Sequence, residues 1–328
     1  MINYHDIKHC EIELSSYCNA ECPLCPRNLF GYPYNSNYTV RHLTLENVKT
    51  IFDREFCSRV KFTFEGNFGD PVMNPELLDI VEYLNSSIKI CTNGSMQTKK
   101  FWQDLAKYNV HILFGIDGLA GTHEIYRRNT RWQTVIDNAK TFISSGGSAT
   151  WKMIEFDHNR SEITKCRELS KQLGFKDFQL VNHGRDTGPV FDRQGNLERV
   201  LGNFTGSTEL SHYLDVIENG DMFLEDIWDT PKQVSCQALR DSSIYVSSIG
   251  EVYPCCFMGF QPRTYGKGRW HQPVNQQIQQ LLDNNNALER PLRECIDWFN
   301  RIPSCWNKTS FEEGRLVVCD SSCGKVPI

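Results

Sequence analysis

The 328-residue chain has no long hydrophobic run, no signal-peptide pattern and no basic cluster, and each absence excludes a class of protein. Its apolar runs, such as 110–116, are far too short to span a bilayer, which takes about 20 residues. The N-terminal stretch MINYHDIKHCEIEL lacks a charged n-region and an apolar h-region. The net charge is −5, and no block of Lys or Arg offers a surface for a polyanion. We therefore expect a cytoplasmic protein with no nucleic-acid partner and no membrane contact.

Cysteine, in contrast, is abundant, with 14 residues. In a reducing compartment, clustered cysteines indicate metal ligands or redox groups rather than disulfides. Three of them crowd the stretch SSYCNAECPLCPRN at 15–28, and seven lie between Cys236 and Cys323. The remaining four lie singly in apolar stretches, where a cysteine usually acts as a small buried hydrophobic residue: Cys10, Cys57, Cys91 and Cys166.

Strand-like and helix-like patterns alternate from the N-terminus to about residue 185. The predicted strands are 9–15, 59–66, 88–94, 110–118, 149–159 and 176–181. Helical spacing of apolar residues follows five of them, at 43–56 (with Thr44 as N-cap), 75–87, 99–109, around 132–142 and 161–175. Such alternation predicts an α/β fold with a parallel sheet and right-handed crossovers. Six βα units are too few for a closed eight-stranded barrel, so we expect an open, partial (βα)6 TIM-like barrel.

The chain divides into three predicted regions. Residues 1–185 form the partial barrel, 186–234 are Gly- and polar-rich and are typical of a linker, and 235–328 form a small cysteine-rich domain. Within the last region, SSIYVSSIGEVYPCC predicts a hairpin that turns at Ile249 and Gly250.

Cys18, Cys22 and Cys25 place three thiols on one tight loop directly after the first predicted strand. A zinc site would need a fourth ligand, for which Cys10 and His9 are the nearest candidates. A [4Fe–4S] cluster also usually takes four cysteines. With only three, one iron is left for a ligand that carries an amine and a carboxylate.

This CxxxCxxC spacing after the first strand resembles the radical S-adenosylmethionine (radical SAM) superfamily. In that family the fourth iron is chelated by the amino and carboxylate groups of the methionine moiety of SAM. The resemblance therefore implies that Cys18, Cys22 and Cys25 hold a SAM-binding [4Fe–4S] cluster.

Further motifs follow the later strands in the family's order. The resemblance implies that SAM contacts Phe68, Gly69 and Asp70 in a turn similar to the family's GGEP, with Phe68 replacing a glycine and Asp70 replacing a glutamate. It also implies cofactor contacts at Thr92 and Asn93 of a TNG turn, at Asp117 of IDG, and at Asn159 after the fifth strand. Each motif alone also fits an ordinary turn or helix cap.

The C-terminal cysteines resemble the SPASM/twitch extension of radical SAM enzymes, which binds auxiliary clusters. Cys236 and the pattern Gly250-x4-Cys255 match its opening, and Cys319-x3-Cys323 supplies a second pair. We expect these four cysteines to hold one auxiliary [4Fe–4S] cluster. Cys305 is an alternative to Cys319, Cys256 and Cys295 are expected to be non-ligands, and a zinc ribbon at the same cysteines is an alternative to the cluster.

The resemblance implies an enzyme that cleaves SAM reductively to a 5′-deoxyadenosyl radical, which abstracts hydrogen from a substrate. Flavodoxin or ferredoxin would donate the electron. The first strand is expected within about ten residues of Met1, which leaves no room for a dedicated N-terminal peptide-binding domain. This favours an oxidoreductase that oxidises or rearranges a small-molecule or partner-delivered substrate. A peptide-modifying maturase and a non-catalytic iron–sulfur or zinc protein are the alternatives. Candidate substrate contacts are the loop 30–38 and residues Asn182, His183 and Arg185.

Overall fold

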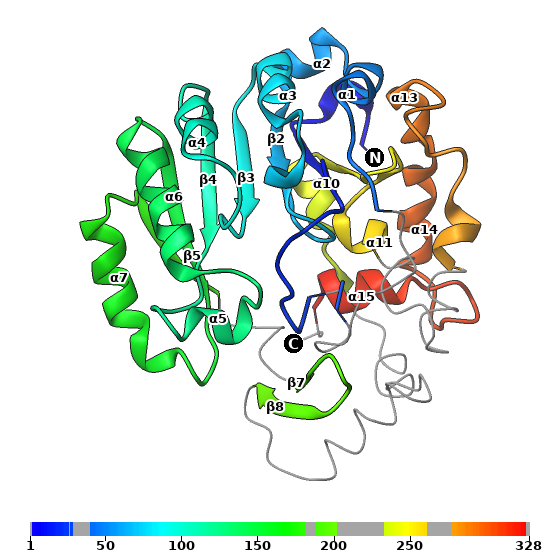
Figure 1. Ribbon diagram of the computed structural model, residues 1–328. Helices are drawn as coiled ribbons and strands as arrows, with labels where there is room; N and C mark the ends of the chain where they lie inside the picture. Colours follow the sequence, from blue (N-terminus) through cyan, green and yellow to red (C-terminus); the bar gives the residue numbers. More distant parts are fainter. Residues whose placement is uncertain are drawn as a thin grey trace.

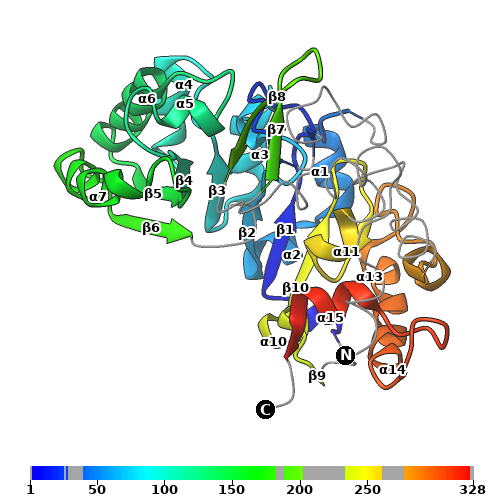
Figure 2. The ribbon, with the colours of Figure 1, turned by 90° about the horizontal axis from the view of Figure 1, so that it is seen from below.

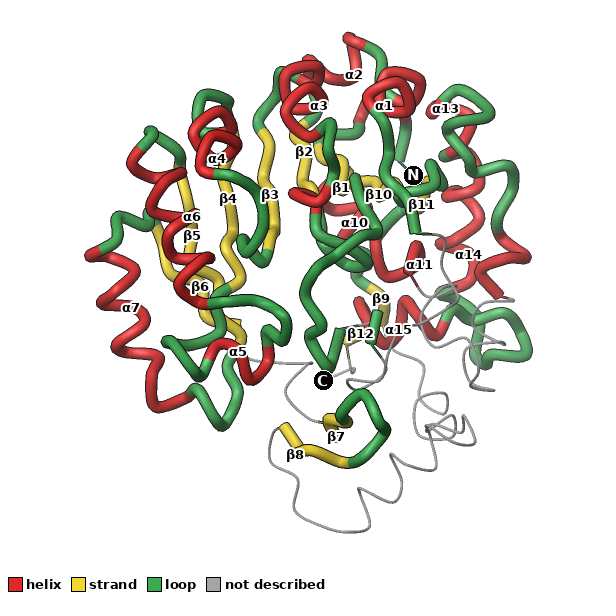
Figure 3. The backbone as a smooth tube through the Cα atoms, in the orientation of Figure 1, coloured by secondary structure: helices red, strands yellow, loops and turns green. Residues whose placement is uncertain are grey.

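The computed structural model describes residues 2–25, 27–28, 40–181, 188–201, 233–260 and 277–325. Its centre is an eight-stranded sheet with the strand order β11-β10-β1-β2-β3-β4-β5-β6, which fans across the molecule in Figures 1 and 3. Strands β1 to β6 are parallel: β1 His9–Ile12, β2 Lys61–Phe64, β3 Ile88–Thr92, β4 Val110–Gly115, β5 Ser148–Ile154 and β6 Asp177–Val181. This confirms the predicted open, partial α/β barrel of six parallel strands.

The helices between these strands follow the predicted order. They are α1 Leu45–Ile51, α2 Arg54–Arg59, α3 Leu77–Leu84, α4 Lys99–Leu105, α5 His123–Tyr126, α6 Trp132–Ser144 and α7 Ile163–Gln172. One prediction was wrong in detail, because the single helix expected at 43–56 is two helices. Thr44 caps α1 as predicted, in a capping box with Asn47. The backbone of Phe52 then adopts an extended conformation, which ends α1. The Asp53 side chain caps α2 by accepting a hydrogen bond from the Phe56 N–H.

The two faces of the sheet differ in chemistry because side chains alternate along each strand. One face packs against the helices and forms the main apolar core, which includes Ile12, Phe62, Ile90, Phe114 and Trp151. Leu113 and Ile154 lie at alternate positions, but most of these positions carry polar side chains or cysteine: Glu11, Thr63, Lys89, Cys91, His111, Thr150 and Lys152. The polar face is therefore the side of the sheet available for chemistry.

The cysteine-rich C-terminal region shares this sheet. Strand β10 (Ser243–Val246) pairs in parallel with β1, with Ser243 opposite His9, and β11 (Val252–Tyr253) returns antiparallel beside it. The hairpin turns where predicted, with Gly250 at a φ of +85° that favours glycine. The sequence did not predict that this hairpin would extend the barrel sheet.

Further short elements belong to the described chain. They are α10 Gln237–Asp241, α11 Cys256–Phe260, α13 Leu292–Cys295, α14 Ile302–Cys305, α15 Val317–Cys323, the strand pair β9 Gln233–Val234 and β12 Gly324–Lys325, and the 3-10 turns Tyr4–Asp6, Pro71–Met73, Arg160–Glu162 and Asp297–Arg301. Across the described residues, the search for a helix long and apolar enough to cross a membrane found none.

Part of the predicted linker has regular structure. Strands β7 (Gly188–Phe191) and β8 (Leu197–Leu201) form an antiparallel hairpin. Figures 1 and 2 show it beyond the strand ends of the barrel, on the side where α5 lies. The hairpin is therefore placed to cover whatever lies at those strand ends.

Candidate functional site

The three N-terminal cysteines lie on the loop that leaves β1 at the carboxyl end of the sheet. Cys22 is buried, whereas Cys18 and Cys25 are partly buried. The loop is held in a tight turn by the Cys25 N–H, which donates to the Cys22 carbonyl at 3.1 Å, and by Arg27 Nη1, which donates to the Cys18 carbonyl at 3.1 Å. Burial raises the pKa of the Cys18 thiol, and the nearby Asp70 carboxylate raises it further.

A small apolar cluster, separate from the main core, surrounds this loop. The cysteine side chains pack into it, and its other buried members come from the loop itself, α5, the end of β5 and the β7–β8 hairpin: Ala20, Tyr126, Ile154, Phe156, Val190 and Leu201. Two ion pairs hold the hairpin in place. Arg193 of the hairpin pairs with Glu21 of the cysteine loop at 2.6 Å, and Glu198 of the hairpin pairs with Arg128, which follows α5. The cysteine loop therefore lies in a largely water-excluding environment.

The turn after β2 touches the start of the cysteine loop. A Cβ added to Gly69 would lie 2.0 Å from the Ser15 carbonyl oxygen, so only glycine allows this approach. The Asp70 N–H donates to the Tyr17 carbonyl at 2.7 Å. The GGEP-like turn is thus fixed one residue from Cys18.

Asp70 is buried, and both oxygens of its carboxylate are engaged inside the protein. Its oxygens accept from Thr92 Oγ1 at 2.8 and 3.0 Å, from the Asn93 N–H at 2.7 Å and from the Val72 N–H at 3.1 Å. Burial raises the pKa of Asp70, and these hydrogen bonds, led by that from Asn93, lower it. Asp70 therefore ties the turn after β2 to the TNG turn after β3.

Asn93 reaches the cysteine loop directly. Its Nδ2 lies 3.6 Å from Cys18 Sγ and donates to Asn19 Oδ1 at 3.1 Å. Its Oδ1 accepts from the backbone N–H of Ser95 at 2.9 Å. The structure thus brings Asp70, Thr92 and Asn93 together with Cys18, although their expected contacts with SAM stay predictions.

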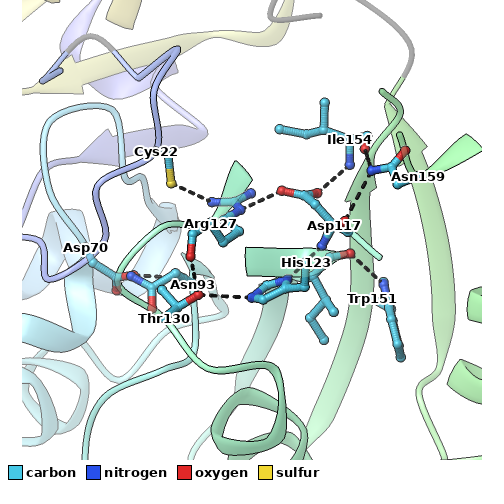
Figure 4. A network of polar contacts seen from close by, with 11 residues as sticks. Cys22, Asp70, Asn93, Asp117, His123, Arg127, Thr130, Trp151, Ile154 and Asn159 are labelled. Atoms are coloured by element: carbon cyan, nitrogen blue, oxygen red, sulfur yellow. Dashed lines mark hydrogen bonds and ion pairs between the residues drawn. The ribbon is translucent and has the colours of Figure 1, made fainter. Parts of the chain in front are cut away.

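A second network links Cys22 to the ends of β4 and β5 (Figure 4). Arg127 Nε lies 2.6 Å from Asp117 Oδ2, and Arg127 Nη1 lies 4.0 Å from Cys22 Sγ. Asp117 Oδ1 also accepts from the Ile154 N–H at 2.7 Å. The result is a partly buried guanidinium beside a thiol. Sequence analysis missed Arg127; its only signal was a cation ten residues after Asp117.

His123 fixes the backbone of this network. The Asp117 N–H donates to His123 Nδ1 at 3.1 Å, so the ring proton sits on Nε2, which contacts Thr130 Oγ1 at 3.1 Å. Burial lowers the pKa of His123 to about 4, so the ring is neutral near pH 7. Thr130 in turn donates to the Arg127 carbonyl at 2.6 Å.

Asn159 is completely buried, and its side-chain amide has internal partners. Its Nδ2 donates to the carbonyls of Asp117 and Ile154 at 3.2 and 2.9 Å, and its Oδ1 accepts from the Phe156 N–H at 2.8 Å. The structure therefore places Asn159 as a clamp between the ends of β4 and β5.

Glu13 is a further site residue that sequence analysis missed. It follows β1, is completely buried, and accepts from the Asn67 N–H at 2.9 Å. Burial raises its pKa to about 8. In the sequence it looks like one more polar residue of an alternating strand, because only burial distinguishes it.

The C-terminal cysteines Cys236, Cys255, Cys319 and Cys323 line one pocket, and most of the remaining lining is apolar. Burial, together with the nearby thiols of Cys236 and Cys323, raises the pKa of Cys255 to about 12. Cys305, Cys256 and Cys295 do not line this pocket. The structure thus groups the four cysteines that we expected to act as ligands.

The donor sets fit sulfur-ligated cofactors, since each consists of free thiols in an apolar setting. This fit concerns the type of donor, because within the described ranges no three His, Cys, Asp or Glu side chains, these cysteines included, are arranged around a single metal ion. The predicted substrate contacts, the loop 30–38 and residues Asn182, His183 and Arg185, lie outside the described residues.

Residues 12–164 match the family model of the radical SAM superfamily. This match identifies a radical SAM domain in the N-terminal part of the chain. A radical SAM domain indicates an enzyme and implies a SAM-binding [4Fe–4S] cluster. The part of the chain that matches contains every motif described above from Cys18 to Asn159.

Three known proteins are similar to this chain. The chain is 22% identical to the tungsten-containing aldehyde ferredoxin oxidoreductase cofactor-modifying protein of Pyrococcus furiosus, over 91% of this chain and 86% of the relative. Its fold is similar to that of SuiB from Streptococcus suis bound to SAM, with a TM-score of 0.59, 16% identity, and coverage of 97% and 73% of the two chains.

It is also similar to anSMEcpe with bound AdoMet, with a TM-score of 0.56, 16% identity, and coverage of 96% and 88%. Both proteins are also known in peptide-bound forms, SuiB with its precursor peptide SuiA and anSMEcpe with the Cp18Cys peptide.

Proposed function

We propose that this radical SAM enzyme cleaves SAM at a [4Fe–4S] cluster held by Cys18, Cys22 and Cys25. The observation that carries the proposal is the convergence of these three cysteines with the motif residues of β2, β3 and β4 at one edge of the sheet. When bound, the cluster and SAM supply a 5′-deoxyadenosyl radical that abstracts a hydrogen atom from the substrate.

The chain's own residues prepare this site in three ways. Arg127 sets a positive charge beside Cys22, which favours a thiolate there and offers a partner for the SAM carboxylate. Asn93 directs an N–H at Cys18. The apolar cluster capped by Val190 and Leu201 excludes water, which protects a radical from side reactions.

We propose that SAM lies along the ends of β2 to β5, bordered by Phe68, Gly69, Thr92 and Asn93. Asp70, Asp117 and Asn159 would then shape the site through their internal hydrogen bonds. We further propose one auxiliary [4Fe–4S] cluster at Cys236, Cys255, Cys319 and Cys323, within a C-terminal SPASM/twitch-like domain at 235–328 that follows the barrel at 1–185. Four thiols would close that cluster to substrate, which suits a structural or electron-accepting role.

For the substrate we favour a small or partner-delivered molecule that is oxidised or rearranged. The name of the Pyrococcus furiosus relative, a cofactor-modifying protein, supports this class. The peptide-bound forms of SuiB and anSMEcpe favour the second candidate, a peptide-modifying enzyme. All fourteen cysteines are free, which suits a reducing cytoplasm where flavodoxin or ferredoxin could supply electrons.

The test is anaerobic reconstitution with iron and sulfide, followed by measurement of 5′-deoxyadenosine formed from SAM in the presence of dithionite. Replacing Cys18, Cys22 and Cys25 together with Ala should abolish this product. Cys166→Ala, a buried cysteine on α7, is the matched control and should keep it. Undiminished cleavage in the triple variant would refute the proposed cluster site.

A further inference from the structure

The polar face of the sheet carries two carboxylates on one side and an ammonium group on the other. Glu11 of β1, Glu65 directly after β2 and Lys152 of β5 are partly buried there. In the described part of the chain, no ion pair joins Lys152 to a carboxylate or either carboxylate to a cation. Partly buried charges are costly unless a partner of opposite charge meets them, so this face suits a charged ligand.

Cys91 of β3 lies between the two signs of charge. Burial raises the pKa of its thiol to about 12, with Glu65 raising it and Lys152 and Lys89 lowering it. The thiol donates to the Glu65 carboxylate, so charges of both signs act on one small area. The strand order places β2 and β5 three strands apart. At about 4.8 Å per strand, Glu65 and Lys152 can hold the two ends of a molecule of up to about 14 Å.

This part of the face lies between the two groups of cysteines. Lys152 stands two residues before Ile154, which packs into the apolar cluster around the N-terminal cysteine loop. On the other side, the Cys256 thiol donates to Glu11, and its neighbour Cys255 lines the C-terminal pocket. A molecule held by these charges would therefore lie between the two proposed cluster sites.

Two further titratable groups of the face leave this pattern of charge intact. Burial raises the pKa of Glu13 to about 8, so the acid is mostly protonated near pH 7. Burial lowers the pKa of His111, whose neutral ring contacts the hydroxyl groups of Ser148 and Thr150 at 2.8 and 2.9 Å. The strands β1 to β5 contain no arginine, the residue best matched to a phosphate. A carboxylate with a single negative charge therefore suits the positive side better.

We propose that this face binds a substrate with a protonated amino group at one end, held by Glu11 and Glu65, and a carboxylate at the other, held by Lys152. This inference rests on the proposed function and names the class of its substrate, a small amino-carboxylate molecule. Hydrogen bonds between charged partners are about twice as strong as those between neutral groups, so each end is recognised separately. The middle of the molecule lies over β3, next to Cys91.

The test measures binding of three radiolabelled probes to the reconstituted holoenzyme by equilibrium dialysis. SAM is present at saturation and no reductant is added, so the SAM site is occupied and the probes report on another site. ω-Aminooctanoate carries both charges on one chain, whereas octylammonium and octanoate carry one charge each. We expect ω-aminooctanoate to bind at least about tenfold more tightly than either of the others, the effect of one further charge-assisted hydrogen bond.

Two variants should separate the two ends. Glu65→Gln should weaken binding of ω-aminooctanoate and octylammonium about tenfold and leave octanoate unchanged. Lys152→Met should weaken ω-aminooctanoate and octanoate and leave octylammonium unchanged. Glu168→Gln and Lys165→Met, at exposed positions of α7, are the matched controls and should change none of the affinities. If Glu65→Gln takes up no iron, Glu11→Gln should show the same loss, confined to the two probes with an amino group.

Equal affinity of the wild type for the three probes would overturn the proposal. So would a variant that weakens all three alike, because this would indicate a general disturbance of the face. No measurable binding of any probe would also overturn it. In each case, formation of 5′-deoxyadenosine by the same preparations after addition of dithionite would leave the proposed function intact, whereas its absence in the wild type would overturn both.

Discussion

A Cβ on Gly69 would stand 2.0 Å from the carbonyl oxygen of Ser15, so these two backbones are in direct contact. The contact joins the turn after β2 to the loop that carries the three cysteines. Neither partner can yield through side-chain rotation, because both sides of the contact are backbone.

Gly69→Ala should therefore push the turn 66–70 away from the cysteine loop. We expect a loss of unfolding free energy of about 1–3 kcal/mol, as for other overpacked sites, together with weaker SAM binding. Thermal unfolding and equilibrium dialysis would measure the two effects. Iron at the C-terminal cysteines should stay, and its loss would show that the effect is not local.

Breaking the ion pair between Arg127 and the fully buried Asp117 should destabilise the protein strongly. Arg127→Gln leaves the Asp117 carboxylate charged and buried with one partner fewer, which costs about 3–5 kcal/mol in comparable sites. Urea unfolding under anaerobic conditions would measure this. Arg193→Gln, at the exposed pair with Glu21, is the control and should cost at most about 1 kcal/mol. Similar losses of unfolding free energy in both variants would contradict the idea that burial makes the Arg127–Asp117 pair the more important one.

The β7–β8 hairpin should protect the N-terminal cluster from air. Val190→Ser places a hydroxyl in the apolar cluster that packs around the cysteine loop, so we expect faster bleaching of this cluster's visible absorbance on exposure to oxygen. Leu197→Ser on the same hairpin changes a side chain that is 44% exposed and should bleach at the wild-type rate. Equal rates for the two variants would argue against a protective role.

The C-terminal pocket should hold half of the iron. Reconstituted wild-type protein should contain about eight irons per chain, and Cys319→Ala should contain about four. Cys305→Ala should keep all eight, because Cys305 does not line the pocket. About four irons with bound zinc in the wild type would favour the zinc ribbon. Loss of iron in Cys305→Ala but not in Cys319→Ala would show that the third ligand is misassigned.

Glu13 should make stability fall as the pH rises. Its pKa is raised by burial from 4.5 to about 8, so the folded state holds a proton that the unfolded state releases. The free energy of unfolding should then decrease between about pH 4.5 and 8, with Glu65 adding to the repulsion. Glu13→Gln should flatten this slope in thermal unfolding without SAM, whereas the exposed Glu168→Gln should not. An unchanged slope in Glu13→Gln would mean that burial does not shift the pKa of Glu13.

The sequence predicted the barrel well because its strands and helices carry local signals. In the first strand, apolar Cys10 and Ile12 alternate with polar residues, and this pattern depends only on neighbours in the chain. The same is true of the capping box at Thr44. The same holds for the cysteine motif and the turns at 68–71, 92–94 and 116–118, because residue types and their spacing along the chain are enough to recognise them.

The missed features depend on burial or on contacts between distant residues. Glu13 and Arg127 look like ordinary polar residues until packing removes them from water. The sequence predicts a linker where the β7–β8 hairpin lies, because the two strands are short and stand in a Gly- and polar-rich stretch. Their buried residues are Pro189, Val190, Phe191 and Leu201. The pairing of β10 with β1 has no local signal at all.

That last pairing has a consequence for how the protein is made. His9 and Ser243 are paired but stand 234 positions apart (243 − 9), so β1 keeps an open edge while most of the chain is still being synthesised. At about 5–20 residues per second, the ribosome needs on the order of 10–50 s to deliver β10. Until then the nascent barrel exposes unpaired backbone groups that can recruit a strand from a neighbouring chain. The cysteine-rich region therefore also covers the β1 edge of the barrel sheet, so a chain that ends before β10 should require chaperones to stay in solution.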